Sequence, residues 1–215
     1  METWEQLVTY VSANGGYIWT QFYRHFLMAA YGVLFAAVIS IPLGILIAKY
    51  KKLSGWVLAL GNIIQTIPAL GALAVLMIVL GLGPNTVIVT LMLYSILPIT
   101  QNTYVGMKEV DQSIIEAGHA SGMTKFQLLR MVELPLAISV IMAGLRTALV
   151  VGIGIAAIGA FVGAGGLGAI IIRGTNATDG TALILAGAIP TALMAICTDL
   201  FMGWLERKLN PVKSS

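Results

Sequence analysis

The chain has 215 residues, of which 58% are hydrophobic and only 10% are charged. A soluble domain carries roughly 25% charged residues, so this chain has too few charges to cover a surface that faces water. The composition therefore predicts an all-α integral membrane protein. The formal net charge of +3 is small and the basic residues do not cluster, which argues against a nucleic-acid partner. The single cysteine, Cys197, excludes an intrachain disulfide.

Five apolar segments are long enough to cross a bilayer, which takes about 20 mostly apolar residues. They run over 26–48, 55–82, 85–106, 135–172 and 182–205. The second is interrupted at Pro68, and the fourth is too long for one simple span. Its Gly-rich end, residues 156–180, predicts a short extra helix or a re-entrant segment on the outer side, with a sixth span as the alternative. Residues 1–215 are expected to form a single transmembrane domain.

The basic residues predict the orientation, because the cytoplasmic ends of spans are enriched in Lys and Arg. Nine of them lie on one side of the predicted membrane. They are Lys49, Lys51, Lys52, Lys108, Lys125, Arg130, Arg207, Lys208 and Lys213. Only Arg24 and Arg173 lie on the other side. The N-terminus is therefore expected outside and the C-terminus in the cytoplasm, whereas a sixth span would place the tail outside against this bias.

Residues 111–134 form a polar stretch between two spans on the predicted cytoplasmic side. Two capping boxes, each a Ser or Thr followed three residues later by a Glu or Gln, predict two helix starts. They pair Ser113 with Glu116 and Thr124 with Gln127. Gly122 suits a left-handed C-cap between them. The pattern predicts a cytoplasmic loop made of two short helices with a bend at Gly122.

This loop resembles the EAA motif of ABC-importer permeases, in which Glu-Ala-Ala is followed at fixed spacing by Gly and then by Ile-x-Leu-Pro. The matching residues are Glu116, Ala117, Gly118, Gly122, Val132, Leu134 and Pro135. Gly118 stands where the family has Ala, so the first short helix is expected to be at most somewhat looser at this position. Val132 stands where the family has Ile. The resemblance covers roughly residues 22–208. It implies the five-span core of type I ABC-importer permeases.

The resemblance also implies what the loop does. It would be a coupling helix that sits in a groove of a cytosolic ATP-binding subunit. ATP and Mg would bind to that subunit, so this chain would carry no cofactor and no enzymatic activity of its own. Glu116 would cap its helix and offer a carboxylate to the ATPase, although capping alone is the simpler interpretation. A second permease chain, identical or paralogous, is expected because five helices are too few to enclose a pathway.

A finer resemblance concerns residues 143–148 and 163–168, which are similar to permeases of the osmoprotectant branch. That branch imports glycine betaine, carnitine, choline or proline betaine. The resemblance implies a multi-pass permease of the bacterial cytoplasmic membrane that receives a compatible solute from an external binding protein. Permeases for methionine and phosphonate are the nearest alternatives.

Polar residues inside the spans are the candidates for the pathway. Arg146 lies about 16 Å into its helix, and Asp199 also lies within a span. A charge at such depth needs a partner or water, so the two are expected to pair or each to face the pathway. A tie between helices is the simpler of these readings. Gln65, Thr66 and Asn102 are weaker candidates, as cavity lining or as contacts between helices.

Other functions have little support in the sequence. Gly163, Gly165 and Gly168 match a dinucleotide fingerprint, but that motif needs a preceding strand and a βαβ unit, so helix packing or a tight turn explains them better. Residues with metal-ligand spacing, a Walker A motif and paired carboxylates are absent. A stand-alone ion-coupled transporter remains the alternative, with Asp199 as its acidic candidate, and an intramembrane enzyme is disfavoured.

Overall fold

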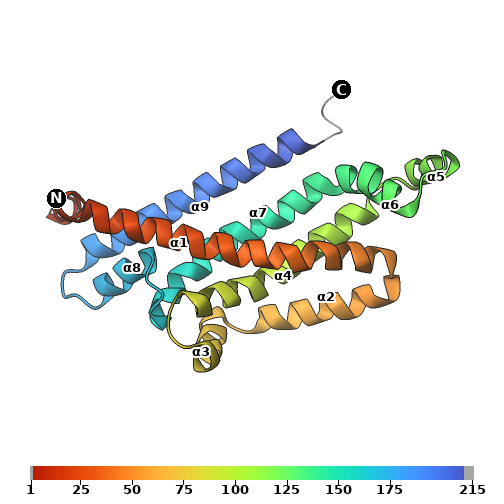
Figure 1. The fold of residues 1–215 in the computed structure, drawn as a ribbon. Coiled ribbons are helices and arrows are strands. Elements are labelled where there is room, and N and C mark those ends of the chain that lie inside the picture. Colours follow the sequence, from red (N-terminus) through yellow and green to blue (C-terminus); the bar gives the residue numbers. More distant parts are fainter. Residues whose placement is uncertain (1, 211–215) are drawn as a thin grey trace.

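A computed structural model of the protein describes residues 2–210, and all regular structure in this part of the chain is helical (Figure 1). The α-helices are α1 (Glu2–Lys49), α2 (Lys51–Thr66), α3 (Ala69–Leu80), α4 (Pro84–Lys108), α5 (Gln112–Ala120), α6 (Lys125–Leu128), α7 (Leu134–Ile158), α8 (Leu167–Thr175) and α9 (Thr181–Leu209). A π-helical turn, η1 (Leu129–Glu133), leads into α7, and a 3-10 turn, η2 (Gly159–Val162), follows it. The predicted all-α class is confirmed.

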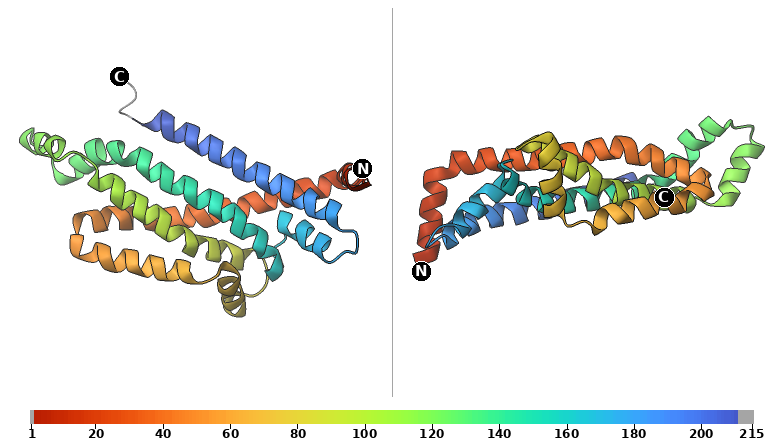
Figure 2. Two further views of the ribbon diagram at one scale, coloured as in Figure 1. Left: turned by 180° about the vertical axis from the view of Figure 1, so that it is seen from behind. Right: turned by 90° about the horizontal axis from the view of Figure 1, so that it is seen from below.

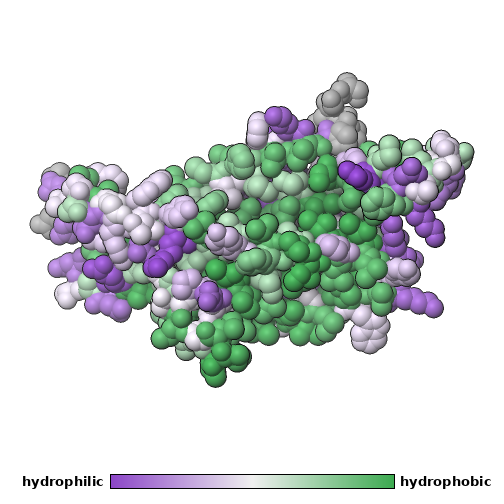
Figure 3. All heavy atoms as spheres, in the orientation of Figure 1, coloured by the Kyte–Doolittle hydropathy of each residue, from purple (hydrophilic) through white to green (hydrophobic). Residues whose placement is uncertain are grey.

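The bundle consists of α1, α4, α7 and α9, each long and apolar enough to cross a membrane. Helix α4 packs between α1 and α7, and α7 packs in turn against α9. Branched side chains such as Val87, Leu91, Ile99 and Ile153 are fully buried between them. Apolar residues cover the middle of the molecule, while polar residues gather at its two ends (Figure 3). This distribution is that of a bundle surrounded by lipid.

The first helix is longer than the predicted span over 26–48, because α1 begins at Glu2. It changes direction at Asn14, whose φ of −119° and ψ of 19° are not helical. Asn14 Nδ2 donates a 3.1 Å hydrogen bond to the carbonyl of Tyr10, so a side chain satisfies a backbone group next to the bend. The stretch before the bend runs across the end of the bundle (Figure 2, right).

The segment over 55–82 is a sharply bent pair of helices. The predicted interruption at Pro68 is confirmed, because α2 and α3 meet there at 93°. Ile67 takes the extended backbone that a following proline favours, which ends α2. The 16 residues of α2 extend about 24 Å, less than the roughly 30 Å of a hydrocarbon core. The described residues therefore contain four candidate spans, or five if the bent pair counts as one.

The Gly-rich segment over 156–180 folds back on the bundle. It passes through η2 and a tight turn, in which Gly163, Gly165 and Gly166 have the positive φ that favours glycine. Helix α8 then extends only about 14 Å over its nine residues and packs against α9. The segment thus contains a short helix, and its place relative to the membrane stays a prediction.

Candidate functional site

The predicted coupling loop, α5 and α6, projects beyond the bundle at the end where α4 and α9 finish (Figure 1). The predicted capping box of Ser113 and Glu116 is wrong, because α5 starts earlier. Asp111 is the N-cap, and its Oδ1 accepts a 2.8 Å hydrogen bond from the backbone N–H of Ser113. This bond lowers the pKa of the Asp111 carboxyl, so the cap is charged at neutral pH. Glu116 lies further along α5 with an exposed side chain, held only by a long 3.5 Å bond from Gln112.

The bend between α5 and α6 forms as the sequence predicts. Gly122 has a φ of +78°, which confirms the left-handed C-cap. The backbone N–H groups of Gly122 and Met123 donate back to carbonyls of the last turn of α5, as in a Schellman motif. The second capping box is also confirmed, because Thr124 and Gln127 each accept from the other's backbone N–H. The orientation of α6 relative to α5 is therefore set by local hydrogen bonds.

The two short helices touch through Gly118 and Leu128. Both residues are buried, and a Cβ atom on Gly118 would lie 2.5 Å from Cδ1 of Leu128. The missing side chain thus lets α6 close against α5. Gly118 therefore has a packing role between α5 and α6 and does not merely loosen α5.

Apolar side chains are exposed on this projecting loop. Phe126 and Met131 expose 68% and 63% of their surface, Ile114 exposes 43%, and Ala117 is exposed beside Glu116. Exposed apolar side chains are typical of surfaces that contact another protein or a membrane, and docking of this loop stays a prediction.

The loop joins the membrane part of the chain without a break. Leu134 and Pro135 open α7 directly after the π turn η1, in which the backbone N–H of Leu134 donates to the carbonyl of Leu129. Glu133 is buried just before them, and Nζ of Lys49 at the end of α1 lies 3.7 Å from its Oε2. This contact was missed by the sequence analysis, although an acidic residue at the entry to a span was a visible signal.

On α2, beside the bundle, the predicted residue Gln65 satisfies a backbone group that a proline leaves free. Pro98 in α4 has no N–H, so the carbonyl of Tyr94 loses its helical partner. Gln65 Nε2 donates to that carbonyl at 3.1 Å, and the Tyr94 hydroxyl donates to the carbonyl of Ile67. These two bonds hold the break between α2 and α3 against α4.

A cavity of about 340 Å³ lies beside this contact, between α2, α4 and α7. Its polar wall is formed by Gln65, Tyr94, Ser95 and Thr147. The other two weak candidates do not line it. Thr66 bonds back to Ile63 in its own helix at 2.7 Å. Asn102 bonds to the carbonyl of Pro98 at 2.8 Å and lies against Gly144 of α7, so it belongs to a helix contact.

Arg146 on α7 and Asp199 on α9 lie together as a bidentate ion pair. Nε and Nη2 of the arginine lie 2.6 Å from Oδ1 and Oδ2 of the aspartate. Nη1 lies 3.4 Å from Oε2 of Glu206, which the sequence analysis missed although it follows Asp199 by two helical turns. Gly203 makes room for the guanidinium, because a Cβ atom there would lie 2.9 Å from Nη1. The structure thus joins α7 and α9 through three charged groups.

This charged cluster also faces open space. The side chains of Arg146 and Asp199 are 35% and 39% exposed, and they line a cavity of about 390 Å³. Thr147 and Val151 line both this cavity and the one beside Tyr94, so the two lie next to each other along α7. The predicted pairing is therefore observed, while the alternative that these residues face the transport pathway stays a prediction.

At the opposite end of the bundle, two side chains of α1 cap α8. Gln21 Oε1 accepts a 2.7 Å hydrogen bond from the N–H of Gly166, and His25 Nδ1 accepts from Leu167 at 3.2 Å. The fully buried His25 ring is therefore protonated on Nε2, which donates to the carbonyl of Ile153 at 2.8 Å. The sequence signal was two polar residues one turn apart. Because these side chains occupy the start of α8, the glycine turn serves packing rather than nucleotide binding.

Replacing His25 with Ala should destabilise the protein by about 2–4 kcal/mol, because two buried backbone groups on α7 and α8 lose their partner. Thermal unfolding in detergent measures this change. His119→Ala is the matched control, since His119 is exposed and its removal should leave the midpoint nearly unchanged. Equal midpoints for the two variants would contradict the capping role.

These features are those of an integral membrane permease with a projecting helical loop and partly polar cavities between its helices. Residues 40–211 match the family described as the binding-protein-dependent transport system inner membrane component, and the chain belongs to this family of ABC-transporter permeases. The family predicted from the loop is thereby confirmed.

Individual relatives cover almost the whole chain. It is 70% identical, over 99% of its length and 93% of the relative's, to the glycine betaine/carnitine/choline transport system permease protein OpuCD of Bacillus subtilis (strain 168). It is 64% identical, over 100% and 96%, to the carnitine transport permease protein OpuCD of Listeria monocytogenes serotype 1/2a (strain 10403S). Its fold is similar to a solved chain of the inward-facing MetNI methionine ABC transporter, with a TM-score of 0.81, 23% identity and coverage of 89% and 95%.

Proposed function

We propose that this chain is the permease subunit of an ATP-driven importer for a compatible solute such as glycine betaine, carnitine or choline. The observation that carries the proposal is 70% identity, along nearly the full length of both chains, to a permease named for those three solutes. The solved structure of a methionine transporter supports the fold alone, because its identity is only 23%.

The two cavities along α7 suit such solutes chemically. Glycine betaine, carnitine and choline share a quaternary ammonium group, which aromatic rings attract through cation–π interactions. Tyr94 lines one cavity, and the cluster of Arg146, Asp199 and Glu206 beside it has a formal net charge of −1. A wall with one aromatic ring and a small negative charge suits passage rather than tight binding. Selection of the solute therefore falls to an external binding protein.

The proposal also assigns the partners and the orientation. The exposed surface of α5 and α6 docks on a cytosolic subunit that binds ATP and Mg²⁺, and a second permease chain closes the cavities along α7. Five spans, with the bent pair counted as one, would put the two termini on opposite sides of the membrane, and in this proposal the N-terminus lies outside. The basic residues support this orientation, because eight of the nine expected in the cytoplasm belong to the loop and to the helix ends on its side of the bundle. Helix α8, which carries Arg173, lies at the other end (Figure 1). The predicted contribution of Lys213 lies outside the described residues.

A crosslink from the loop tests the docking step. In a Cys197→Ala background, a cysteine at Ser121 should capture an ATP-binding subunit in native membranes, with a yield that changes on adding nucleotide. The matched control is Asn176→Cys, at the other end of the bundle, which should capture none. If Ser121→Cys captures no ATPase and is freely labelled in inverted vesicles, the importer assignment is wrong.

Transport by the reconstituted complex tests the solute. Vesicles that contain this permease, its ATPase and its binding protein should take up radiolabelled glycine betaine, carnitine or choline only with ATP inside. Uptake of methionine or a phosphonate instead would place the protein with those importers. Uptake driven by an ion gradient, with no ATPase present, would support the stand-alone transporter.

A further inference from the structure

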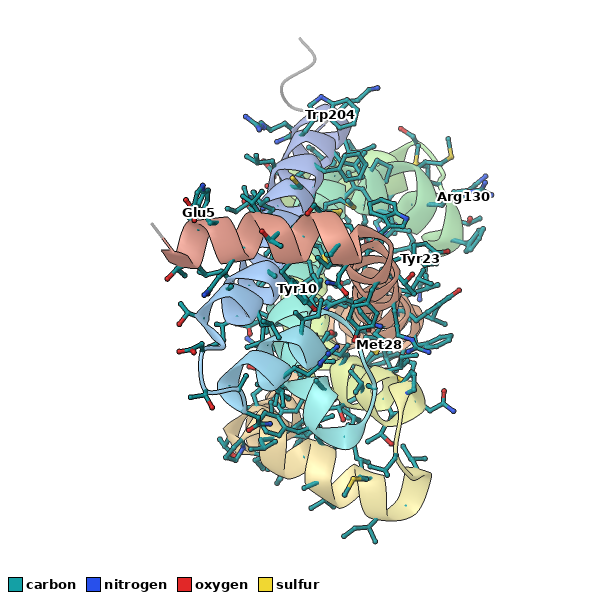
Figure 4. The ribbon with its side chains drawn as sticks, turned by 90° about the vertical axis from the view of Figure 1, so that its left-hand side faces the viewer. Glu5, Tyr10, Tyr23, Met28, Arg130 and Trp204 are labelled. Carbon is teal, nitrogen blue, oxygen red and sulfur yellow. The ribbon has the colours of Figure 1, made fainter. Side chains whose placement is uncertain are left out.

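The first stretch of α1, residues 2–13, has no role in the transport mechanism described above. It precedes the bend at Asn14 and runs across the end of the bundle opposite the coupling loop (Figure 4). The family model matches the chain only from residue 40, so it does not describe this stretch. Its surface therefore has to be explained from its own contacts.

One side of this stretch is apolar and uncovered. Trp4, Val8 and Val11 recur at helical spacing, and they expose 64%, 56% and 43% of their surface. Together with Leu185 and Ile189 of α9, they line an apolar groove of about 480 Å³. In water this arrangement would leave a contiguous apolar patch exposed, which calls for an occupant.

The other side of residues 2–13 is polar. The residues of α9 that lie next to each side show which way that side faces. Glu5 and Thr9 line a hollow with Asp179 and Ala182, where α9 begins. The apolar groove reaches Pro190, eight residues or about 12 Å further along α9. The polar side therefore faces the end of the bundle, and the apolar side faces the part of α9 that lies in the membrane.

The groove opens onto an apolar stripe along α9. The stripe is defined by exposed residues on one side of the helix: Ile189, Leu193, Ile196 and Leu200. The buried residues Met194 and Met202 lie on the opposite side, so the stripe faces away from the bundle. A spanning helix presents such a side to acyl chains, and the groove is its continuation.

Exposed aromatic residues lie on both sides of the bend in α1. Trp19 and Tyr23 follow the bend, and they expose 68% and 58% of their surface. Trp and Tyr are enriched where a membrane protein crosses the boundary between water and lipid. With Trp4 they place the stretch over 2–13 at that boundary.

We propose that residues 2–13 form an interfacial helix on the membrane surface, and that the groove between this helix and α9 holds a lipid acyl chain. A helix with these two sides inserts its apolar side about 5–10 Å into the region between headgroups and chains. Leu7 packs against the start of α9, so the inserted helix holds the ends of α1 and α9 at one depth. The inference does not depend on which solute the protein carries.

Spin labels on the full chain test this placement. In a Cys197→Ala background, nitroxides are attached at Val8 and Val11 on the apolar side and at Gln6 and Thr9 on the polar side. The protein is reconstituted in vesicles of phosphatidylglycerol and phosphatidylethanolamine. Collisions with oxygen, which partitions into lipid, are compared with collisions with a water-soluble nickel chelate.

Labels at Val8 and Val11 should favour oxygen, while those at Gln6 and Thr9 should favour the nickel chelate. Two results overturn the proposal. If all four labels favour the nickel chelate, the stretch lies in water. If Val8 and Val11 are shielded from both reagents and crosslink to a second polypeptide, the groove holds a copy of this chain or another protein.

Discussion

Replacing Arg146 with Met is expected to lower the yield of folded protein from membranes several-fold. The arginine makes two 2.6 Å contacts with Asp199 and lies 3.4 Å from Glu206, so the variant leaves two carboxylates without their cation. An unpaired charge within a membrane-spanning segment is costly, so removing one partner of this pair should cost more than removing both. The ratio of monodisperse to total protein on size-exclusion chromatography measures the loss.

A double variant separates the ion pair from other causes. Arg146→Met combined with Asp199→Leu should recover more folded protein than Arg146→Met alone, because the unpaired charge is removed with its partner. Arg130→Met is the control for loss of an arginine, since Arg130 is exposed on η1, and it should change stability by no more than about 0.5 kcal/mol. Additive losses in the double variant would show that the two residues do not act as a pair.

Local patterns predicted the loop better than the bundle. Gly122, Thr124 and Gln127 act on neighbours within a few residues, so their spacing was enough to place a C-cap and a capping box. The N-cap Asp111 was not predicted, because several polar residues precede the helix and each of them could cap it. In the structure, the Asp111 carboxylate accepts the hydrogen bond from the backbone N–H of Ser113. Helix ends are therefore set by hydrogen bonds that a motif only partly specifies.

Contacts between distant residues were harder to predict. Charge at membrane depth was enough to expect that Arg146 and Asp199 need partners, and the structure pairs them. Nothing local indicated that Gln65 bonds to the carbonyl of Tyr94, because that bond depends on how the α2–α3 break packs against α4. His25 likewise accepts a hydrogen bond from the backbone N–H of Leu167, 142 residues later, and this bond depends on how α8 packs against α1.

The bend at Asn14 helps to explain why the first helix begins earlier than the predicted span. Residues before it are too polar to read as a span, yet they are helical because one side packs on α9 through Leu7. Hydropathy reports whether a segment crosses a membrane, not whether it is helical. A search for membrane spans by hydropathy therefore does not detect a helix that lies on the surface.

Replacing Gly118 with Leu is expected to reduce ATP-driven uptake by about tenfold, a loss typical of weakened coupling between two sites. A leucine side chain cannot fit where a Cβ atom alone would already lie 2.5 Å from Cδ1 of Leu128, so α6 must move away from α5. Folding of the bundle should be unaffected, because the contact lies in the projecting loop. Uptake and solute-stimulated ATP hydrolysis are measured together in proteoliposomes that hold the whole complex.

A graded series at Gly118 shows whether packing is the cause. Gly118→Ala meets only the end of the flexible Leu128 side chain, which can rotate, so uptake should stay close to that of the unmodified protein. Leu128→Ala opens space on the other side of the contact and should restore part of the uptake lost in Gly118→Leu. If Ala and Leu at Gly118 are equally harmful and Leu128→Ala gives no rescue, the contact between α5 and α6 does not set the docking geometry. In that case, the exposed residues Glu116 and Phe126 would have to carry the coupling through direct contact with the ATPase.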